Sequence, residues 1–190
     1  MKRIVIFASG SGSNAENIIG FFQTKRTAKV THVLTNNEHA KVLGRCKRLK
    51  INALVFSKEE FFKSDKVLGF LKKEADLIIL AGFLWKVPKH IVANFPNKIV
   101  NIHPALLPKY GGKGMYGSHV HKAIKNNNEA ETGITIHYVN EHYDEGAIIF
   151  QAKTALSPED SVEDIAKKVH ELEYEHYPKV IEDIILSKNE

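Results

Sequence analysis

The chain is poor in cysteine and has no long apolar run. Cys46 is the single cysteine among 190 residues, which excludes an intramolecular disulfide and a thiolate cluster for a metal. The longest apolar run, residues 77–85, is nine residues long, whereas a membrane-spanning helix needs about 20. The apolar start of the chain ends at Ser9 after five apolar residues, too few for a signal peptide. We therefore expect a cytoplasmic protein with no membrane partner.

Charge is nearly balanced, so a strong excess of one sign is lacking too. There are 27 Lys and Arg against 22 Asp and Glu, and the net charge of +5 is spread along the chain. The densest basic stretch, residues 41–50, is typical of the solvent-facing side of a helix. Nucleic-acid-binding chains cluster basic residues with aromatic ones, so we expect no nucleic-acid partner. The mild surplus of positive charge favours small anionic substrates.

The chain does contain short apolar segments that alternate with amphipathic ones. Strands are expected at residues 3–8, 30–35, 53–56, 76–81, 98–101, 132–139 and 147–151. Helices are expected at 14–25, 40–49, 58–74, 88–94, 119–125 and 161–186, the third with Phe61, Phe62, Leu68 and Leu71 facing inward. With no linker or repeat, this order predicts one α/β domain over residues 1–190. The expected fold is Rossmann-like, with a mostly parallel central sheet and helices on both faces.

Three polar segments follow predicted strands, at residues 9–14, 82–84 and 101–103. In parallel sheets covered by helices, ligands bind beyond the carboxyl ends of the strands. We therefore expect these three segments to meet at one edge of the sheet and to form a ligand site.

The first of these segments, Ser-Gly-Ser-Gly-Ser-Asn at 9–14, connects a strand to a helix. Its glycines permit a tight turn, and the N–H groups at the start of the helix can bind a phosphate. A plain turn with a serine cap is the alternative. A dinucleotide fingerprint needs a third glycine, where Ala15 stands, and an acid after the second strand, where Asn36 and Asn37 stand. The pattern therefore favours a phosphomonoester over a dinucleotide.

Asn101, His103 and Asp144 are the candidate catalytic residues. Asn101 and His103 are two positions apart on a strand, so both side chains leave the same face. An amide donor beside an imidazole can stabilise a developing oxyanion, and Asp144 can pair with that imidazole and orient it. The alternatives are an ordinary polar strand end for Asn101 and His103, and an ordinary turn residue for Asp144.

The histidines do not predict a metal site. His119 and His121 are close in sequence, but residues i and i+2 of a helix point apart. Thiolates and the H-x-x-x-H spacing of zinc sites are also lacking. We therefore expect chemistry without a metal.

Motifs along essentially the whole chain point to a known family. They are Gly10-Ser11-Gly12-Ser13-Asn14, Leu80-Ala81-Gly82-Phe83, Asn101-Ile102-His103-Pro104-Ala105-Leu106-Leu107-Pro108, Gly133-Ile134-Thr135-Ile136-His137, Asp144-Glu145-Gly146 and Tyr177-Pro178. The N-x-H-P-x-L-L-P stretch with a later D-x-G is specific to folate-dependent formyltransferases. The Gly-Ser-Asn turn, Glu173 and the Tyr-Pro pair are similar to the phosphoribosylglycinamide formyltransferase family.

The resemblance implies transfer of a formyl group from 10-formyltetrahydrofolate, a co-substrate, to the amine of 5'-phosphoribosylglycinamide in de novo purine biosynthesis. It implies that the catalytic group is Asn101, His103 and Asp144. It implies that the ribonucleotide is bound by Gly12, Ser13, Asn14 and Glu173. It implies that the folate is bound by Leu84, Trp85, Lys86, Val87, Asn101, Asn140, Glu141 and Asp144.

Two segments depart from the family pattern. After Phe83 the family commonly has a small apolar residue and then Arg, whereas this chain has Leu84-Trp85-Lys86. The glycine-rich loop at 111–117 is longer than the usual form, and His119 beyond it is a candidate substrate contact. The resemblance also implies a basic residue near the folate tail, for which Lys58 and Lys63 are the two candidates.

Other functions remain open on sequence alone. The family alternatives are a formyltetrahydrofolate hydrolase and a methionyl-tRNA formyltransferase, which carry an extra N-terminal and an extra C-terminal domain, for which this chain has no room. Outside the family, a nucleotide-binding module leaves Asn101, His103 and Asp144 unexplained, and the missing fingerprint disfavours a dinucleotide oxidoreductase. A monomer and a homodimer are both compatible with the sequence.

Overall fold

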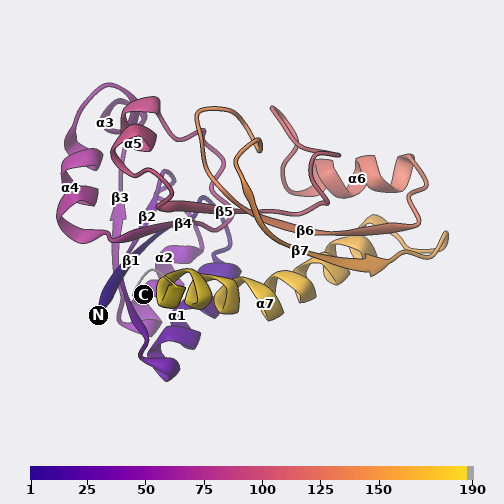
Figure 1. Cartoon of the computed structure of the whole chain (residues 1–190), viewed down its shortest axis with the longest axis horizontal. Helices are drawn as coiled ribbons and strands as arrows, with labels where there is room; N and C mark the ends of the chain where they lie inside the picture. The colour runs from indigo at the N-terminus through magenta and orange to yellow at the C-terminus, as the bar shows by residue number, and fades with distance from the viewer. Residues whose placement is uncertain (188–190) are drawn as a thin grey trace.

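A seven-stranded sheet of order β3-β2-β1-β4-β5-β6-β7 forms the centre of the computed structural model, which describes residues 1–187 (Figure 1). The last three residues of the expected 1–190 domain lie outside the described residues. The strands are β1 Lys2–Phe7, β2 Ala28–Thr35, β3 Asn52–Val55, β4 Leu77–Leu80, β5 Ile99–His103, β6 Glu131–Tyr138 and β7 Ile148–Ala155. The helices are α1 Ser13–Lys25, α2 Val42–Leu49, α3 Lys58–Phe62, α4 Lys66–Glu74, α5 Lys89–Asn94, α6 Ser118–Asn126 and α7 Val162–Ser187.

The first five strands are parallel, and β6 and β7 are antiparallel to their neighbours. Phe7 of β1 pairs with Leu80 of β4, and Leu80 pairs with Asn101 of β5. Because these residues are last or nearly last in their strands, the segments that follow leave the sheet at one edge. The mostly parallel Rossmann-like sheet predicted from the sequence is confirmed.

Helices cover both faces of the sheet (Figure 1). One core lies between the sheet and α1, α2, α6 and α7, and the other lies under α3, α4 and α5. Tyr177 of α7 is fully buried, and its hydroxyl lies 2.9 Å from the carbonyl oxygen of Leu80 and 3.2 Å from that of Val100. This side chain ties α7 to the two strands that end at the site. Within residues 1–187, none of the helices is long and apolar enough to cross a bilayer.

The helix predicted at 58–74 is wrong as a single element, because α3 and α4 are separate. A capping box between Ser57 and Glu60 starts α3. The hydroxyl of Ser64 then donates to the Glu60 carbonyl and accepts from the Lys66 N–H, and such local bonds compete with helical ones. The inward position predicted for Phe62 is also wrong. Its side chain is 38% exposed and packs against Trp85, whereas Phe61 is buried.

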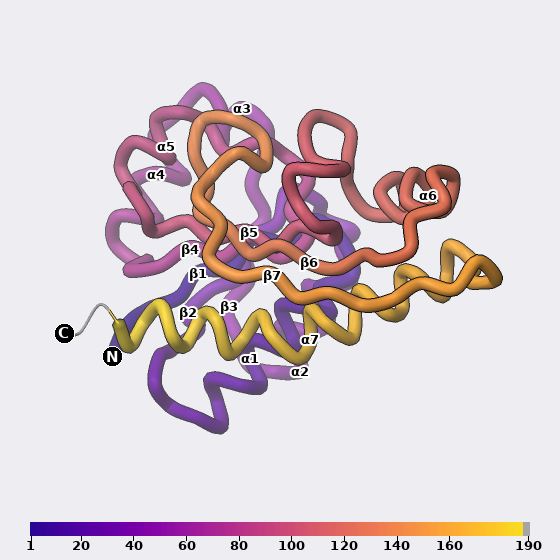
Figure 2. Tube along the Cα trace, turned by 45° about the vertical axis from the view of Figure 1, so that its right-hand side comes forward, coloured from indigo at the N-terminus to yellow at the C-terminus, as the bar shows by residue number. Residues whose placement is uncertain are grey.

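Two long connections, residues 104–117 and 139–147, rise from the same side of the sheet (Figure 2). The first contains a cis peptide bond between Leu107 and Pro108. The buried hydroxyl of Thr135 on β6 accepts from the Leu107 N–H at 2.9 Å and donates to the Ala105 carbonyl at 2.7 Å. Thr135 therefore fixes the path of the chain directly after His103.

Candidate active site

A cleft of about 640 Å³ lies at the carboxyl ends of the strands. Its lining includes Gly10–Asn14, Leu80–Val87, Asn101–Pro104, Gly112–Gly117, His121, His137, Val139, Asn140, His142–Asp144, His170 and Glu173. The predicted meeting of the segments 9–14, 82–84 and 101–103 is therefore confirmed for all but Ser9. The Ser9 hydroxyl is buried just behind the cleft and accepts from the Leu84 N–H at 3.0 Å.

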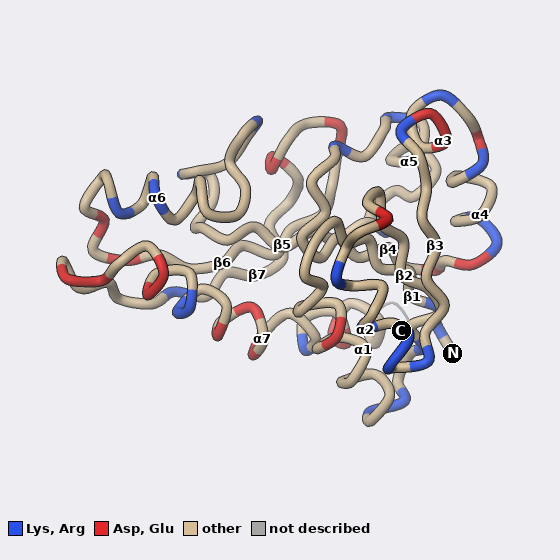
Figure 3. The backbone as a smooth tube through the Cα atoms, turned by 180° about the vertical axis from the view of Figure 1, so that it is seen from behind, with Lys and Arg blue, Asp and Glu red and all other residues tan. Residues whose placement is uncertain are grey.

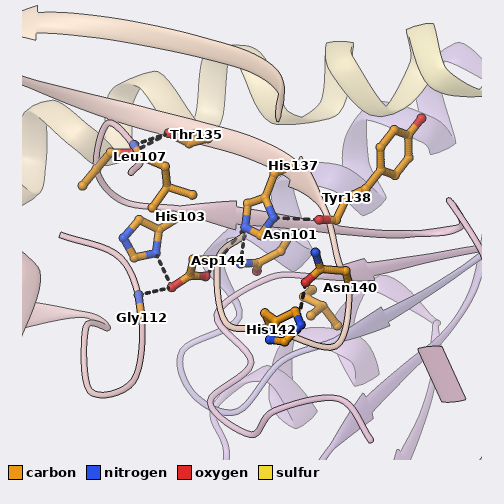
Figure 4. A network of polar contacts seen from close by, with 12 residues as sticks. Asn101, His103, Leu107, Gly112, Thr135, His137, Tyr138, Asn140, His142 and Asp144 are labelled. Atoms are coloured by element: carbon orange, nitrogen blue, oxygen red, sulfur yellow. Dashed lines mark hydrogen bonds and ion pairs between the residues drawn. The ribbon is translucent and has the colours of Figure 1, made fainter. Parts of the chain in front are cut away.

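His103, at the end of β5, is buried between two oxygen acceptors, of which Figure 4 shows the Asp144 carboxylate. Its Nε2 lies 2.7 Å from the carbonyl oxygen of Tyr110, and its Nδ1 lies 3.6 Å from Oδ2 of Asp144. A carbonyl and a carboxylate can only accept hydrogen bonds. Nε2 therefore carries a proton and donates to the Tyr110 carbonyl, and a proton on Nδ1 would face the Asp144 carboxylate at ion-pair distance.

His137, on β6 opposite Asn101, is a member of the cluster that the sequence did not single out. Its Nδ1 lies 2.9 Å from the Tyr138 carbonyl, and its Nε2 lies 3.1 Å from the amide nitrogen of Asn101. These contacts assign the proton to Nδ1, so that Nε2 accepts from Asn101 and the ring is neutral. Burial lowers the pKa of His137, which agrees with the neutral form. The sequence signal that could have indicated His137 is its alternation with Thr135 on the predicted strand at 132–139.

Asp144 lies between these two imidazoles on the 139–147 connection. Its carboxylate accepts from the Gly112 N–H at 2.9 Å, and its Oδ1 lies 3.7 Å from Nε2 of His137 (Figure 4). Because His137 is neutral, the ion pair of Asp144 is with His103. The backbone φ of Asp144 is 54°, a left-handed value that Asp and Asn tolerate.

Gly12 ends the glycine turn and precedes α1. Its φ is 71°, and a Cβ at this position would lie 2.3 Å from Cγ2 of Val42. Both the backbone conformation and the close approach of α2 therefore require glycine here. No side chain among the described residues caps the start of α1, and Ser13 and Asn14, which carry its first N–H groups, line the cleft. These groups, with the helix dipole, form a site suited to an anion.

Glu173 of α7 reaches the same end of the cleft. Its Oε2 accepts from the amide of Asn14 at 2.8 Å and lies 3.0 Å from Nδ1 of His170. The carboxylate thus connects the start of α1 to α7, and its second oxygen remains for a hydroxyl or amine of a ligand. His121 lines the cleft beside it, and burial lowers the pKa of its imidazole. His119, in contrast, is exposed and is not part of the cleft lining formed by the described residues.

The other end of the cleft is mostly apolar. Trp85 lies within a cluster of aromatic rings, its centroid 5.7–6.4 Å from those of Phe56, Phe61, Phe62 and Phe83. The ammonium of Lys86 lies 4.9 Å from the ring centroid of Tyr143 and so connects the 82–87 segment to the 139–147 connection. Leu84, Trp85, Lys86 and Val87 all line this end.

Three predicted contacts are not brought to the cleft. Among the described residues, the lining contains Asn140 and Asp144 but not Glu141, which forms an ion pair with Lys89 at 2.8 Å. The side chain of Asn140 accepts from the His142 N–H at 2.8 Å, as in an Asx turn. Lys58 and Lys63 are likewise outside the described lining, because α3 directs them to solvent.

Comparison with known sequences decides the family. The profile of the formyl transferase family matches residues 2–181. The chain belongs to this family. Within residues 1–187, no three His, Cys, Asp or Glu side chains are grouped as metal ligands would be.

Within this family, the chain is similar over most of its length to proteins named phosphoribosylglycinamide formyltransferase. Phosphoribosylglycinamide formyltransferase of Haemophilus influenzae is 39% identical over 187 residues, which are 95% of this chain and 86% of that protein. The Bacillus subtilis protein of the same name is 31% identical over 97% of this chain and 95% of its own. A crystal structure of glycinamide ribonucleotide transformylase 1 from Symbiobacterium toebii superposes with a TM-score of 0.90, at 29% identity, covering 98% of this formyl transferase chain and 89% of that one.

Proposed function

We propose that this formyl transferase moves the formyl group of 10-formyltetrahydrofolate to the amine of 5'-phosphoribosylglycinamide, a step of de novo purine biosynthesis. One observation carries the proposal. The turn before α1, the polar residues Asn101 and His103, and the apolar segment at 84–87 all line one cleft. Each part fits one portion of the two substrates: a phosphate, a formyl group and a flat heteroaromatic ring. The names of the relatives support the same assignment.

The ribonucleotide fits the end of the cleft at α1. The N–H groups of Ser13 and Asn14, after the turn at Gly12, would hold its phosphate. The free oxygen of Glu173 would accept from ribose hydroxyls or from the glycinamide, which places the amine toward His103.

The folate fits the apolar end. Leu84, Trp85, Lys86 and Val87 would form one wall of its pocket, and the 139–147 connection the other. Asn101, Asn140 and Asp144 line the space between the walls and would provide polar contacts to the pterin ring. For Glu141, the ion pair with Lys89 supports a role in shaping this connection rather than in touching the folate.

Asn101 and His103 act on the formyl oxygen in the proposed reaction. As the amine adds to the formyl carbon, this oxygen gains negative charge. The second N–H of the Asn101 amide would donate a hydrogen bond to it, and the positive charge of a protonated His103, whose ring nitrogens face Tyr110 and Asp144, would stabilise it through space. One well-placed donor of this kind lowers the activation free energy by about 3–4 kcal/mol. Asp144 maintains the charge of His103. The new C–N bond forms, the bond to N10 of the folate breaks, and the amine proton moves to N10, with Asp144 as the nearest base.

Residues 1–190 would act as one formyltransferase domain. No covalent formyl-enzyme is required, and Cys46 is a poor nucleophile, because it is buried in α2 and burial raises the pKa of its thiol. A formyltetrahydrofolate hydrolase is the alternative within the family, in which water replaces the amine.

An assay of the purified protein separates these two reactions. Formation of tetrahydrofolate is followed with 10-formyltetrahydrofolate alone and again with 5'-phosphoribosylglycinamide added. We expect turnover with the ribonucleotide and almost none without it. Equal turnover in both reactions would show that water is the acceptor and would overturn the proposal.

A further inference from the structure

The glycine turn at the phosphate end of the cleft rests on α2. The Val42 N–H donates to the Gly10 carbonyl at 3.2 Å, and Val42 fills the space beside Gly12. One turn further along α2, Nε of Arg45 donates to the carbonyl oxygen of Ser11 at 2.8 Å. Three consecutive residues of the turn are therefore supported from behind by one helix.

Glu16, in the first turn of α1, holds the guanidinium of Arg45 in place. The Glu16 carboxylate forms ion pairs with both Arg45 and Arg48 of the basic helix α2, which lies beside α1 (Figure 3). The side chain of Arg45 is 31% exposed and that of Glu16 is 29% exposed, so both are partly shielded from water. A planar guanidinium can serve two acceptors at fixed angles, here the Ser11 carbonyl and the Glu16 carboxylate.

The direction of the Ser11 carbonyl matters for an anion site. A turn binds phosphate when its N–H groups converge on the ligand and its carbonyl oxygens, which repel an anion, point away. Ser11 and Ser13 line the cleft, whereas Arg45 lies outside the lining formed by the described residues. The bond from Arg45 thus draws the Ser11 carbonyl away from the cleft, on the side opposite the ligand.

We propose that Arg45 is a positioning residue for substrate phosphate: it fixes the Ser11 carbonyl away from the anion and thereby the N–H groups of the turn toward it. This inference rests on the proposed function, since it takes the ribonucleotide phosphate as the ligand. Because the guanidinium of Arg45 is paired with Glu16 and lies outside the described cleft lining, Arg45 acts by orienting the backbone and not as a free positive charge in the cleft.

Arg48 provides a matched control. It shares the ion pair with Glu16 and belongs to the same helix, but the contacts of the described residues give it no bond to the turn. If α2 only needed charge pairing with α1 for stability, Arg45→Ala and Arg48→Ala would have similar effects. If Arg45 positions the turn, Arg45→Ala should weaken binding of the substrate phosphate, whereas Arg48→Ala should not.

Steady-state kinetics with two acceptors test the proposal. The acceptors are 5'-phosphoribosylglycinamide and the phosphate-free glycinamide riboside. For Arg45→Ala we expect KM for the ribonucleotide to rise about tenfold, the size of one lost hydrogen bond to a charged group, with kcat and the folate KM within about twofold. For the riboside, kcat/KM should equal that of the wild type. For Arg48→Ala, all these constants should stay within about twofold of the wild type.

Three results of these measurements would contradict the proposal. An unchanged ribonucleotide KM in Arg45→Ala, an equal loss with the riboside, or an equal effect of Arg48→Ala would overturn the role of Arg45. If Arg45→Ala folds poorly, Glu16→Gln keeps the side-chain volume while loosening the guanidinium, and we expect a severalfold rise in the same KM. An unchanged KM in that variant would overturn the proposal.

Calorimetry keeps this test separate from the proposed reaction. Ribose 5-phosphate is titrated into the wild type and into Arg45→Ala, with ribose as the control ligand. About tenfold weaker binding of the phosphorylated sugar in the variant supports the positioning role even if no formyl transfer occurs. Equal affinity overturns it, whatever the assay of the reaction shows.

Discussion

The carboxylate of Asp144 lies 3.6 Å from Nδ1 of His103, and the other nitrogen of that imidazole lies 2.7 Å from the Tyr110 carbonyl. The second imidazole near Asp144, that of His137, is neutral because Asn101 donates to its Nε2. The negative charge of Asp144 is therefore directed at His103. The hydrogen bond from Asn101, and not distance alone, therefore distinguishes the two imidazoles near Asp144.

Replacing Asp144 by Asn should remove this charge and leave the backbone unchanged, since Asn also tolerates a positive φ. We expect kcat to fall by about a hundredfold or more, because His103 loses the carboxylate that maintains its imidazolium form. The affinity for the ribonucleotide should change little, since its phosphate binds at α1. Kinetics and calorimetry measure the two effects.

Glu145→Gln is the control for this variant, because Glu145 is an exposed neighbour outside the described cleft lining. It should retain near-normal turnover. If Asp144→Asn were as active as Glu145→Gln, Asp144 would be only a turn residue, and Asn101 would be the main remaining catalytic candidate.

Gly12→Ala should destabilise the fold by about 2–4 kcal/mol, from a strained φ and from the contact with Val42. Gly10→Ala should be nearly silent in stability, because a Cβ there meets no described atom within 4 Å. Urea unfolding of both variants gives the comparison. Equal stability of the two would contradict the close packing of α2 on the turn.

Stability should fall on acidification through about pH 6.5, in part because of His121. Burial lowers the pKa of His121 below the 6.5 of an exposed imidazole, an effect offset in part by Glu173 on α7 and increased by His103 on β5. The unfolded chain therefore binds a proton at this position before the folded chain does, and folding is progressively disfavoured as the pH falls. The melting temperature of His121→Gln should depend less on pH than that of the wild type. His119→Gln, an exposed neighbour on α6, should retain the wild-type dependence.

Lys86→Met should raise the folate KM about threefold, because it removes the cation–π contact that joins the two walls of the apolar end. Lys89→Met, at the first residue of α5, removes an exposed ion pair with Glu141 and should change this KM little. Measurements at saturating ribonucleotide isolate the effect on the folate. Equal folate KM values in the two lysine variants would show that Lys86 does not connect the two walls of the apolar end.

The loop at 111–117, with four glycines, should be mobile without substrates and should become ordered as a lid when both are bound. The bond from the Gly112 N–H to Asp144 connects this loop directly to the proposed catalytic group. Hydrogen exchange of the loop amides should slow on addition of both substrates. Identical exchange with and without them would argue against a lid.

The sequence by itself determined the strands, most helices and the edge at which the site forms. Strand and helix periods are local properties of the chain, and so is the serine cap at the start of α7, where the Asp164 N–H donates to Ser161. The rule that ligands bind beyond parallel strands then selected the segments at 9–14, 82–84 and 101–103 without any coordinates, and all but Ser9 line the cleft. For the same reason, Asn101 and His103 could be paired from their spacing alone.

Only the tertiary structure decided how the polar residues share their protons and partners. The role of His137 depends on its register opposite Asn101, which is set by the pairing of β5 with β6. Glu141 was expected in the cleft, yet Lys89 on α5 holds it outside. Arg45 looked like part of a solvated basic helix until its bond to the Ser11 carbonyl was seen. In each case the deciding contact joins residues far apart in sequence, so neither periodicity nor composition carries information about it.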